Sequence, residues 1–178
     1  MIKKLQILTI FSLLTIFSNV SNASDGIRKA QDVFTAGLPV VAAGLSIAYG
    51  DTTGLVQLVK SEGATLLLAE ALKSSIHETR PNGSDNKSFP SGHAAIAFSA
   101  AQYLQMRGGW QFGAPAYLAA TWVAYSRVHV KDHYWKDVVA GGAVGALTTY
   151  YFTDSFRGPR IGVAIAPHSA SIRYSQSW

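Results

Sequence analysis

The chain has 178 residues, of which 48% are hydrophobic and 14% are charged, and this composition excludes an intrinsically disordered protein. The length predicts one domain rather than two. Lys and Arg (15) exceed Asp and Glu (10) by too little to argue for a nucleic-acid partner. The absence of cysteine excludes a disulfide scaffold, a thiolate metal site and a cysteine nucleophile.

The N-terminus is typical of a secretory signal peptide. A basic start, Met1 to Lys4, precedes an apolar run from Leu5 to Phe17, and small residues then offer a cleavage site after Ala23. As a helix, this run would cover about 20 Å, whereas the hydrocarbon core of a bilayer is about 30 Å thick. An uncleaved first transmembrane helix is therefore the weaker alternative to a signal segment over residues 1–23. Both alternatives place the rest of the chain outside the cytosol.

The remaining chain predicts helices with short connections, and residues 24–156 are expected to form one helical domain. Apolar and small residues dominate the candidate segments, Pro81 ends the second segment, and Pro90 begins the third. The expected helices cover Val33 to Tyr49, Gly54 to Thr79, Ser91 to Met106, Ala114 to His129 and Tyr134 to Phe152. The predicted fold class is all-α, a bundle of about five helices after the signal segment.

Two features of the C-terminal part refine this prediction. Gly141 and Gly145 are four residues apart in the fifth helix and would let it pack closely against a neighbour. In the tail, residues 157–178, larger side chains alternate with their neighbours at every second position, first from Ile161 to Ile165 and again in the stretch that ends at Trp178. This alternation predicts a short β-hairpin, which we expect to be a packing appendage.

The first cluster of candidate site residues contains two cations, Lys73 and Arg80. They are seven residues apart, so on one helix they would lie on the same face, two turns apart. No acid is placed to pair with both, and an anion between them would relieve their repulsion. The plain alternative is a solvated basic face.

The second cluster runs from Ser88 to His93. The start of a helix exposes unpaired backbone N–H groups and the positive end of the helix dipole, so it binds phosphate readily. Gly92 has no side chain to block an approaching oxyanion, and His93 could donate a proton to a leaving oxygen. The plain alternative is a helix cap with a histidine nearby.

The third cluster contains Arg127, His133 and Asp137. Four residues separate His133 from Asp137, so the carboxylate could reach one imidazole nitrogen and stabilise the cation formed if the other attacks phosphorus. Arg127 offers a planar fork for phosphate oxygens. His129, His133 and Asp137 also recur every four residues, a stripe that could hold a divalent metal. Because a metal would leave the three cationic side chains without a role, we predict no metal.

In chain order these motifs are Lys73-x6-Arg80-Pro81, Pro90-Ser91-Gly92-His93 and Ser126-Arg127-x5-His133-x3-Asp137. Together they resemble the signature of the type 2 phosphatidic acid phosphatase superfamily, which includes bacterial acid phosphatases and vanadium haloperoxidases. All defining positions match in order over about a third of the chain. The ordered set is specific because independent matches multiply.

The resemblance implies a helical bundle and a phosphohistidine mechanism that needs no metal or other cofactor. His133 would be the nucleophile, His93 the general acid, and Asp137 the partner that orients His133. The implied phosphate ligands are Lys73, Arg80, Ser91, Gly92 and Arg127. One departure is the connection Asn82 to Phe89, which is shorter than is usual in the family. It leaves little material for a lid and predicts an open site.

These observations predict an exported envelope phosphatase that hydrolyses a phosphomonoester or pyrophosphate, with a lipid as the favoured substrate. By resemblance, the candidates are phosphatidic acid, phosphatidylglycerol phosphate, undecaprenyl diphosphate and lipid A phosphates. The expected location is the periplasmic face of the inner membrane, or the periplasm, with membrane association and no nucleic-acid partner. The first and fifth helices are shorter than the about 20 residues of a membrane span. Whether the bundle is embedded in the bilayer, and its oligomeric state, stay open.

Three alternatives remain. A soluble periplasmic acid phosphatase would act on small phosphoesters. A vanadium-dependent haloperoxidase would hold vanadate in the same pocket. A non-catalytic envelope protein would carry a relict site, although the intact set of catalytic groups argues against it.

Overall fold

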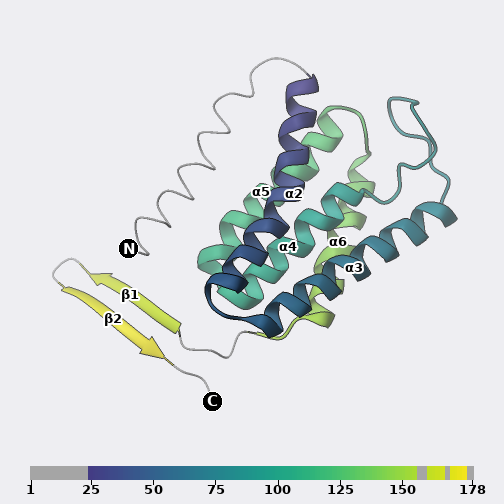
Figure 1. Cartoon of the computed structure of the whole chain (residues 1–178). Coiled ribbons are helices and arrows are strands. Elements are labelled where there is room, and N and C mark those ends of the chain that lie inside the picture. Colours follow the sequence, from purple (N-terminus) through teal and green to yellow (C-terminus); the bar gives the residue numbers. More distant parts are fainter. Residues whose placement is uncertain (1–23, 156–159, 167–168, 176–178) are drawn as a thin grey trace.

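The computed structural model describes residues 24–155, 160–166 and 169–175. The helices of this part are α2 (Ser24–Ala48), α3 (Thr52–Ser75), α4 (Gly92–Gly108), α5 (Trp110–His129) and α6 (Trp135–Phe152). They form a bundle in which α4 packs against the four other helices (Figure 1). The prediction of an all-α helical bundle is confirmed. The predicted signal segment, residues 1–23, lies outside the described residues.

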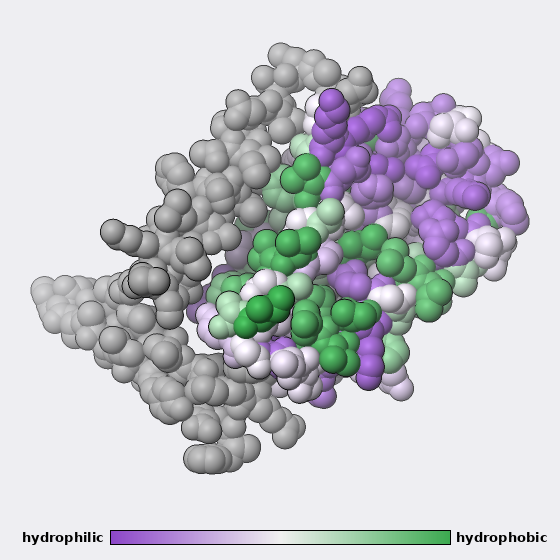
Figure 2. Space-filling model, viewed as in Figure 1, coloured by the Kyte–Doolittle hydropathy of each residue, from purple (hydrophilic) through white to green (hydrophobic). Residues whose placement is uncertain are grey.

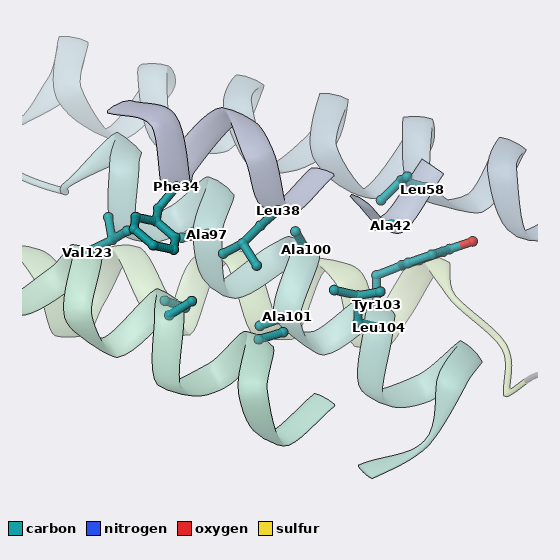
Figure 3. Close-up of a cluster of buried hydrophobic side chains, with 13 residues drawn as sticks. Phe34, Leu38, Ala42, Leu58, Ala97, Ala100, Ala101, Tyr103, Leu104 and Val123 are labelled. Atoms are coloured by element: carbon teal, nitrogen blue, oxygen red, sulfur yellow. The ribbon is translucent and has the colours of Figure 1, made fainter. Parts of the chain in front are cut away.

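Helix α4 can be central because its buried face is made mostly of small residues. Five alanines of α4 are fully buried, and they lie against larger side chains from its neighbours. Phe34 and Leu38 come from α2, Leu58 from α3 and Val123 from α5, with Tyr103 of α4 beside them (Figure 3). Burying this apolar surface is the main driving force that holds the helices together.

The glycines predicted to allow close packing lie where α6 meets α4. A Cβ atom at Gly145 would overlap the backbone oxygen of Ala95, and one at Gly141 would overlap that of Ser91. Both glycines are buried, so the approach of the two backbones depends on the missing side chains. This contact also fixes the start of α4 relative to the start of α6.

Three helix boundaries differ by four or more residues from those expected, and one of them is the start of α5 at Trp110 rather than Ala114. Helix α2 begins at Ser24 rather than Val33, because its early polar residues find partners in the bundle: Gln31 in α5 and Asp32 in α4. Helix α3 ends at Ser75 rather than Thr79, and Glu78 then pairs with Lys87 in an isolated β-bridge. The expectation that Arg80 shares a helix face with Lys73 is therefore wrong.

The connection between α3 and α4 folds back on itself instead of extending the helix. Ser88 N donates to the carbonyl of Glu78 (2.9 Å), Arg80 N donates to Asp85 (3.0 Å), and Gly83 adopts the left-handed conformation at φ 72°. These contacts close a compact loop that returns the chain to the start of α4. Arg80 reaches the end of the bundle from this loop.

The predicted C-terminal hairpin is present. Strands β1 (Arg160–Ala166) and β2 (Ser169–Ser175) pair antiparallel, with Arg160 opposite Ser175 and Ala166 opposite Ser169.

Candidate active site

The three predicted clusters meet at one end of the bundle. They come from the end of α3, the α3–α4 connection, the start of α4, the end of α5 and the region around the start of α6. Arg80 Nη1 lies 3.4 Å from His133 Nε2, and Lys73 Nζ lies 3.2 Å from where a Cβ of Gly92 would stand. Figure 2 shows hydrophilic residues gathered over the end that carries the α3–α4 connection. The structure thus brings the predicted residues together, while their chemical roles stay predictions.

The hydrogen-bond geometry fixes the tautomer of His133, which is buried in the turn between α5 and α6. A guanidinium can only donate, so the nitrogen that faces Arg80, Nε2, must offer a lone pair. The proton of the neutral ring then sits on Nδ1, which faces Asp137 Oδ2 at 3.5 Å. This tautomer leaves Nε2 as the atom able to attack an electrophile.

His133 is held in its neutral form. Its pKa is lowered from the ordinary 6.5 to about 3, first by burial and then by the nearby charges of Arg127, Arg80 and Lys73. The backbone of Ser88 acts the other way, with a smaller effect. The ring therefore keeps its lone pair at neutral pH, as a nucleophile must.

Asp137 links α6 to the α3–α4 connection. It is fully buried in the first turn of α6, where its Oδ2 accepts from Tyr134 N (2.9 Å) and from Ser88 Oγ (2.5 Å). Its backbone oxygen accepts from Ser91 N at 3.0 Å. Asp137 therefore holds together the starts of α4 and α6, in addition to facing His133.

The start of α4 is shaped to receive an anion. Ser91 is the N-cap, and its Oγ accepts from Ala94 N at 3.4 Å. The Ser91 hydroxyl, which the sequence predicts to bind phosphate, therefore also caps the helix. The next N–H groups, of Gly92 and His93, are among those that a helix start leaves without a carbonyl partner. Gly92 leaves them uncovered and leaves room for Lys73 Nζ.

Each of the three cations contacts one acid. Lys73 Nζ lies 3.7 Å from Glu70, Arg80 Nε 2.8 Å from Asp85, and Arg127 Nη2 3.1 Å from Asp132. Lys73 and Arg80 thus contact different acids, and none of the ion pairs in the described part of the chain joins both cations to one acid, as the sequence predicted.

Arg127 nevertheless has an unmet donor. Its Nε is buried without a hydrogen-bond partner in the described part of the chain, and burial lowers the pKa of its guanidinium. A buried N–H group without a partner is costly, and a phosphate oxygen would satisfy it.

Sequence reasoning missed Asp132, which lies directly before His133. This buried carboxylate accepts from Arg28 Nη1 (2.6 Å to each oxygen) and Asn82 Nδ2 (3.0 Å), and it also faces Arg127. Its backbone oxygen accepts from Arg80 Nη1 at 3.3 Å. Asp132 therefore ties two phosphate-binding candidates to the turn that carries His133. An acid beside the candidate nucleophile was its only signal in the sequence.

Sequence reasoning also missed the polar face of α2. Arg28 reaches Asp132, Gln31 Oε1 accepts from Ser126 Oγ at 2.9 Å, and Asp32 Oδ1 lies 2.9 Å from His93 Nε2. These three residues are spaced three and four apart, so they share one helix face. That spacing was visible in the sequence, but it indicated a site only once α2 was known to begin at Ser24.

The alternative metal stripe is not continuous. His129 is exposed in the last turn of α5 and stacks on Tyr125, whereas His133 follows the end of that helix and Asp137 belongs to α6. The helical spacing that suggested a stripe is interrupted between residues 130 and 134. Among the described residues, no group of three His, Cys, Asp or Glu side chains is placed to hold a metal ion.

The sequence matches one family model and is similar to known proteins. The PAP2 superfamily model matches residues 54–160. The chain is 34% identical over 100 residues to the Lipid A 1-phosphatase of Porphyromonas gingivalis, covering 52% of this chain and 22% of that protein. It is 30% identical over 134 residues to the Lipid A 4'-phosphatase of Helicobacter pylori, covering 69% of this chain and 68% of that protein. The chain thus spans less than a quarter of the length of the first relative.

The fold is also found among solved structures. The chain resembles the crystal structure of Aquifex aeolicus LpxE with a TM-score of 0.54 at 20% identity, covering 75% of this chain and 97% of that one. At this identity the likeness shows the fold alone. The family match includes all three clusters, from Lys73 to Asp137, which meet in space as described above. The chain belongs to the PAP2 superfamily.

Proposed function

We propose that the chain is a membrane-associated phosphatase that removes a phosphate group from a lipid through a phosphohistidine intermediate. The observation that carries this proposal is a neutral His133 whose Nε2 lone pair faces Arg80, close to Lys73, Arg127 and the start of α4. Such a site combines a nucleophile with fixed positive charge, which is what attack on a phosphate anion requires.

The proposed reaction has two steps. His133 Nε2 attacks phosphorus and forms an N–P bond while the P–O bond to the lipid breaks. His93 gives a proton to the leaving oxygen, and Asp137 stabilises the charge that develops on His133 by facing its Nδ1–H. Water then gives a proton to His93 and hydrolyses the N–P bond, which releases inorganic phosphate and restores both histidines. The cations and the start of α4 stabilise the added negative charge throughout.

Two observations support a lipid substrate. The two relatives described above carry the name lipid A phosphatase. In the described part of the chain, the segment Gly26–Ala48 is long and apolar enough to cross a membrane. A headgroup phosphate could reach the site while the apolar part of the lipid stays in the bilayer.

The test is phosphate release by the purified full chain from a panel of lipid phosphates in micelles and of soluble phosphoesters. We expect turnover of lipid phosphates, and loss of at least about a thousandfold in His133→Ala. His129→Ala is the matched control, because His129 is exposed and belongs to no cluster of the site. Near-normal turnover of an activated aryl phosphate by His133→Ala would contradict the phosphohistidine step.

The same assay tests the absence of a metal. We expect activity to survive EDTA, because three cationic side chains and a helix start supply positive charge, and we expect vanadate to inhibit by mimicking five-coordinate phosphorus. Loss of activity in EDTA that a divalent ion restores would contradict this expectation.

A further inference from the structure

The start of α2 reaches the site from outside the family match. The match begins at residue 54, whereas α2 covers Ser24–Ala48. In Figure 1, α2 runs beside α4 and α5, and contacts with both helices hold it there. Any role of α2 in the chemistry is therefore additional to the three matched motifs.

Two contacts fix the first turns of α2 against this end of the bundle. Arg28 Nη1 contacts both oxygens of Asp132 at 2.6 Å, and Asp132 is buried. One turn further along α2, the buried Gln31 accepts a hydrogen bond from the buried Ser126. An ion pair in which one guanidinium nitrogen contacts both carboxylate oxygens, together with a buried hydrogen bond, leaves this helix face little freedom to rotate.

The next residue on that face, Asp32, contacts His93. Its Oδ1 lies 2.9 Å from Nε2 of the ring, within hydrogen-bond distance. A carboxylate can only accept, so Nε2 carries the proton of this hydrogen bond. Nδ1 is then the other ring nitrogen, and a second proton held there is the one the ring can give to a leaving oxygen.

We propose that Asp32 is a positioning residue for His93: it fixes the ring orientation and favours the protonated form of the imidazole, which donates to the leaving oxygen. The pairing repeats, on the acid, the arrangement proposed for Asp137 and the nucleophile. The inference rests on the proposed function, because it needs His93 to act as a proton donor.

The charges around His93 explain why a carboxylate is needed. Burial, Arg127 from α5 and Lys73 from α3 all lower the pKa of His93, and Asp32 from α2 raises it by hydrogen bonding and by charge. The causes that lower the pKa of His93 outweigh those that raise it, so its pKa lies below the ordinary 6.5. Without Asp32 the ring would lose the proton at still lower pH, and less of the enzyme would hold an acid for the leaving group.

The experiment compares Asp32→Asn with the wild type on two substrates, phosphatidic acid in mixed micelles and p-nitrophenyl phosphate. Asparagine can still accept from Nε2 but carries no charge. The lipid alcohol released from phosphatidic acid is a poor leaving group. On this substrate we expect kcat to fall about tenfold and the alkaline limb of kcat/KM to move to lower pH. On p-nitrophenyl phosphate, whose leaving group needs no proton, kcat should stay within about twofold. Asp32→Glu should restore part of the loss.

Asp154→Asn is the matched control, because it removes the same charge at the end of α6 remote from the site, where Asp154 contacts Gln57. Its pH profile should match that of the wild type. An Asp32→Asn enzyme with an unchanged alkaline limb, or with equal losses on both substrates, would overturn the inference. A wild type that hydrolyses neither substrate would instead contradict the proposed function.

Discussion

The contact between Lys73 and Gly92 shows how one missing side chain can serve phosphate binding. A Cβ at position 92 would stand 3.2 Å from Lys73 Nζ. The lysine side chain can relieve this close contact only by moving its ammonium group away from the start of α4. Alanine in a helix is otherwise favourable compared with glycine by about 0.5–1 kcal/mol. The cost of Gly92→Ala should therefore appear in substrate binding and not in stability.

We predict that Gly92→Ala raises KM about tenfold and leaves the free energy of unfolding unchanged or slightly higher. The measurements are initial rates over a range of substrate concentrations and chemical denaturation of the same preparation. Unchanged kinetics in a folded variant would show that Lys73 does not bind the phosphate.

The two histidines predict an acidic pH optimum for the free enzyme. His133 must be neutral to attack, and its pKa of about 3 means that activity falls only as pH drops towards that value. His93 must be protonated to donate, and its pKa is lowered from 6.5, so activity falls as pH rises through a value below 6.5.

A plot of kcat/KM against pH for an alkyl phosphate should therefore be bell-shaped, with its maximum between these limits. An aryl phosphate with an acidic leaving group should lose the alkaline limb. A maximum above pH 7 for the alkyl phosphate would contradict the proposed roles.

At the level of residues, the sequence predicted that the three motifs form one site. It did not predict which other side chains contact the site residues. Lys73, His93 and His133 were recognised because motif spacing is local. Arg28 and Asp132 contact each other across 104 residues of sequence, and nothing local predicts such a pair. Long-range pairs follow from helix packing, which the pattern of apolar residues determines only approximately.

Among the helices, the contact between α4 and α6 depends most on side-chain size. A Cβ at Gly145 would meet backbone atoms of Ala95 and Ser99, which cannot move as a side-chain end can. We predict that Gly145→Ala destabilises the protein by about 1–3 kcal/mol, measured by chemical denaturation.

The matched control is Gly63→Ala in α3, where a Cβ would meet nothing within 4 Å. This change should stabilise by about 0.5–1 kcal/mol, because alanine favours the helix. Equal effects at the two positions would show that close packing of α4 and α6 is not what requires Gly145.

The errors in helix boundaries have identifiable causes. The polar start of α2 was left out of the predicted helix, which was taken to begin at Val33, where nearly all residues become apolar or small. Pro81 was taken as the end of α3, yet α3 ends at Ser75. The chain then becomes extended, and Glu78 forms a β-bridge with Lys87. Pairing of this kind competes with the last helix turn and cannot be read from a helical pattern.

Considered as a whole, the molecule separates polar from apolar surface. The candidate site lies at the hydrophilic end, and most of the large apolar side chains that are exposed lie along the helices away from it (Figure 2). On α2, Val33, Val40 and Ile47 are exposed and recur every seven residues, so they form one stripe. On α3, three consecutive leucines, residues 66–68, are exposed. Such apolar surface typically contacts a membrane or another protein.

We predict that the full-length protein stays with the membrane fraction through this surface. Leu67 is 76% exposed on α3 and Leu147 is 68% exposed on α6, so Leu67→Glu with Leu147→Glu removes apolar contact without opening the core. The double variant should wash off membranes more readily in carbonate and lose activity on micellar lipid phosphates. Its rate on p-nitrophenyl phosphate should be kept, because neither residue lies near His133.

The matched control is Lys60→Gln, an exposed polar position on α3. Wild-type activity that osmotic shock alone releases, and that is faster on small phosphoesters than on lipid phosphates, would contradict the prediction and favour a soluble acid phosphatase.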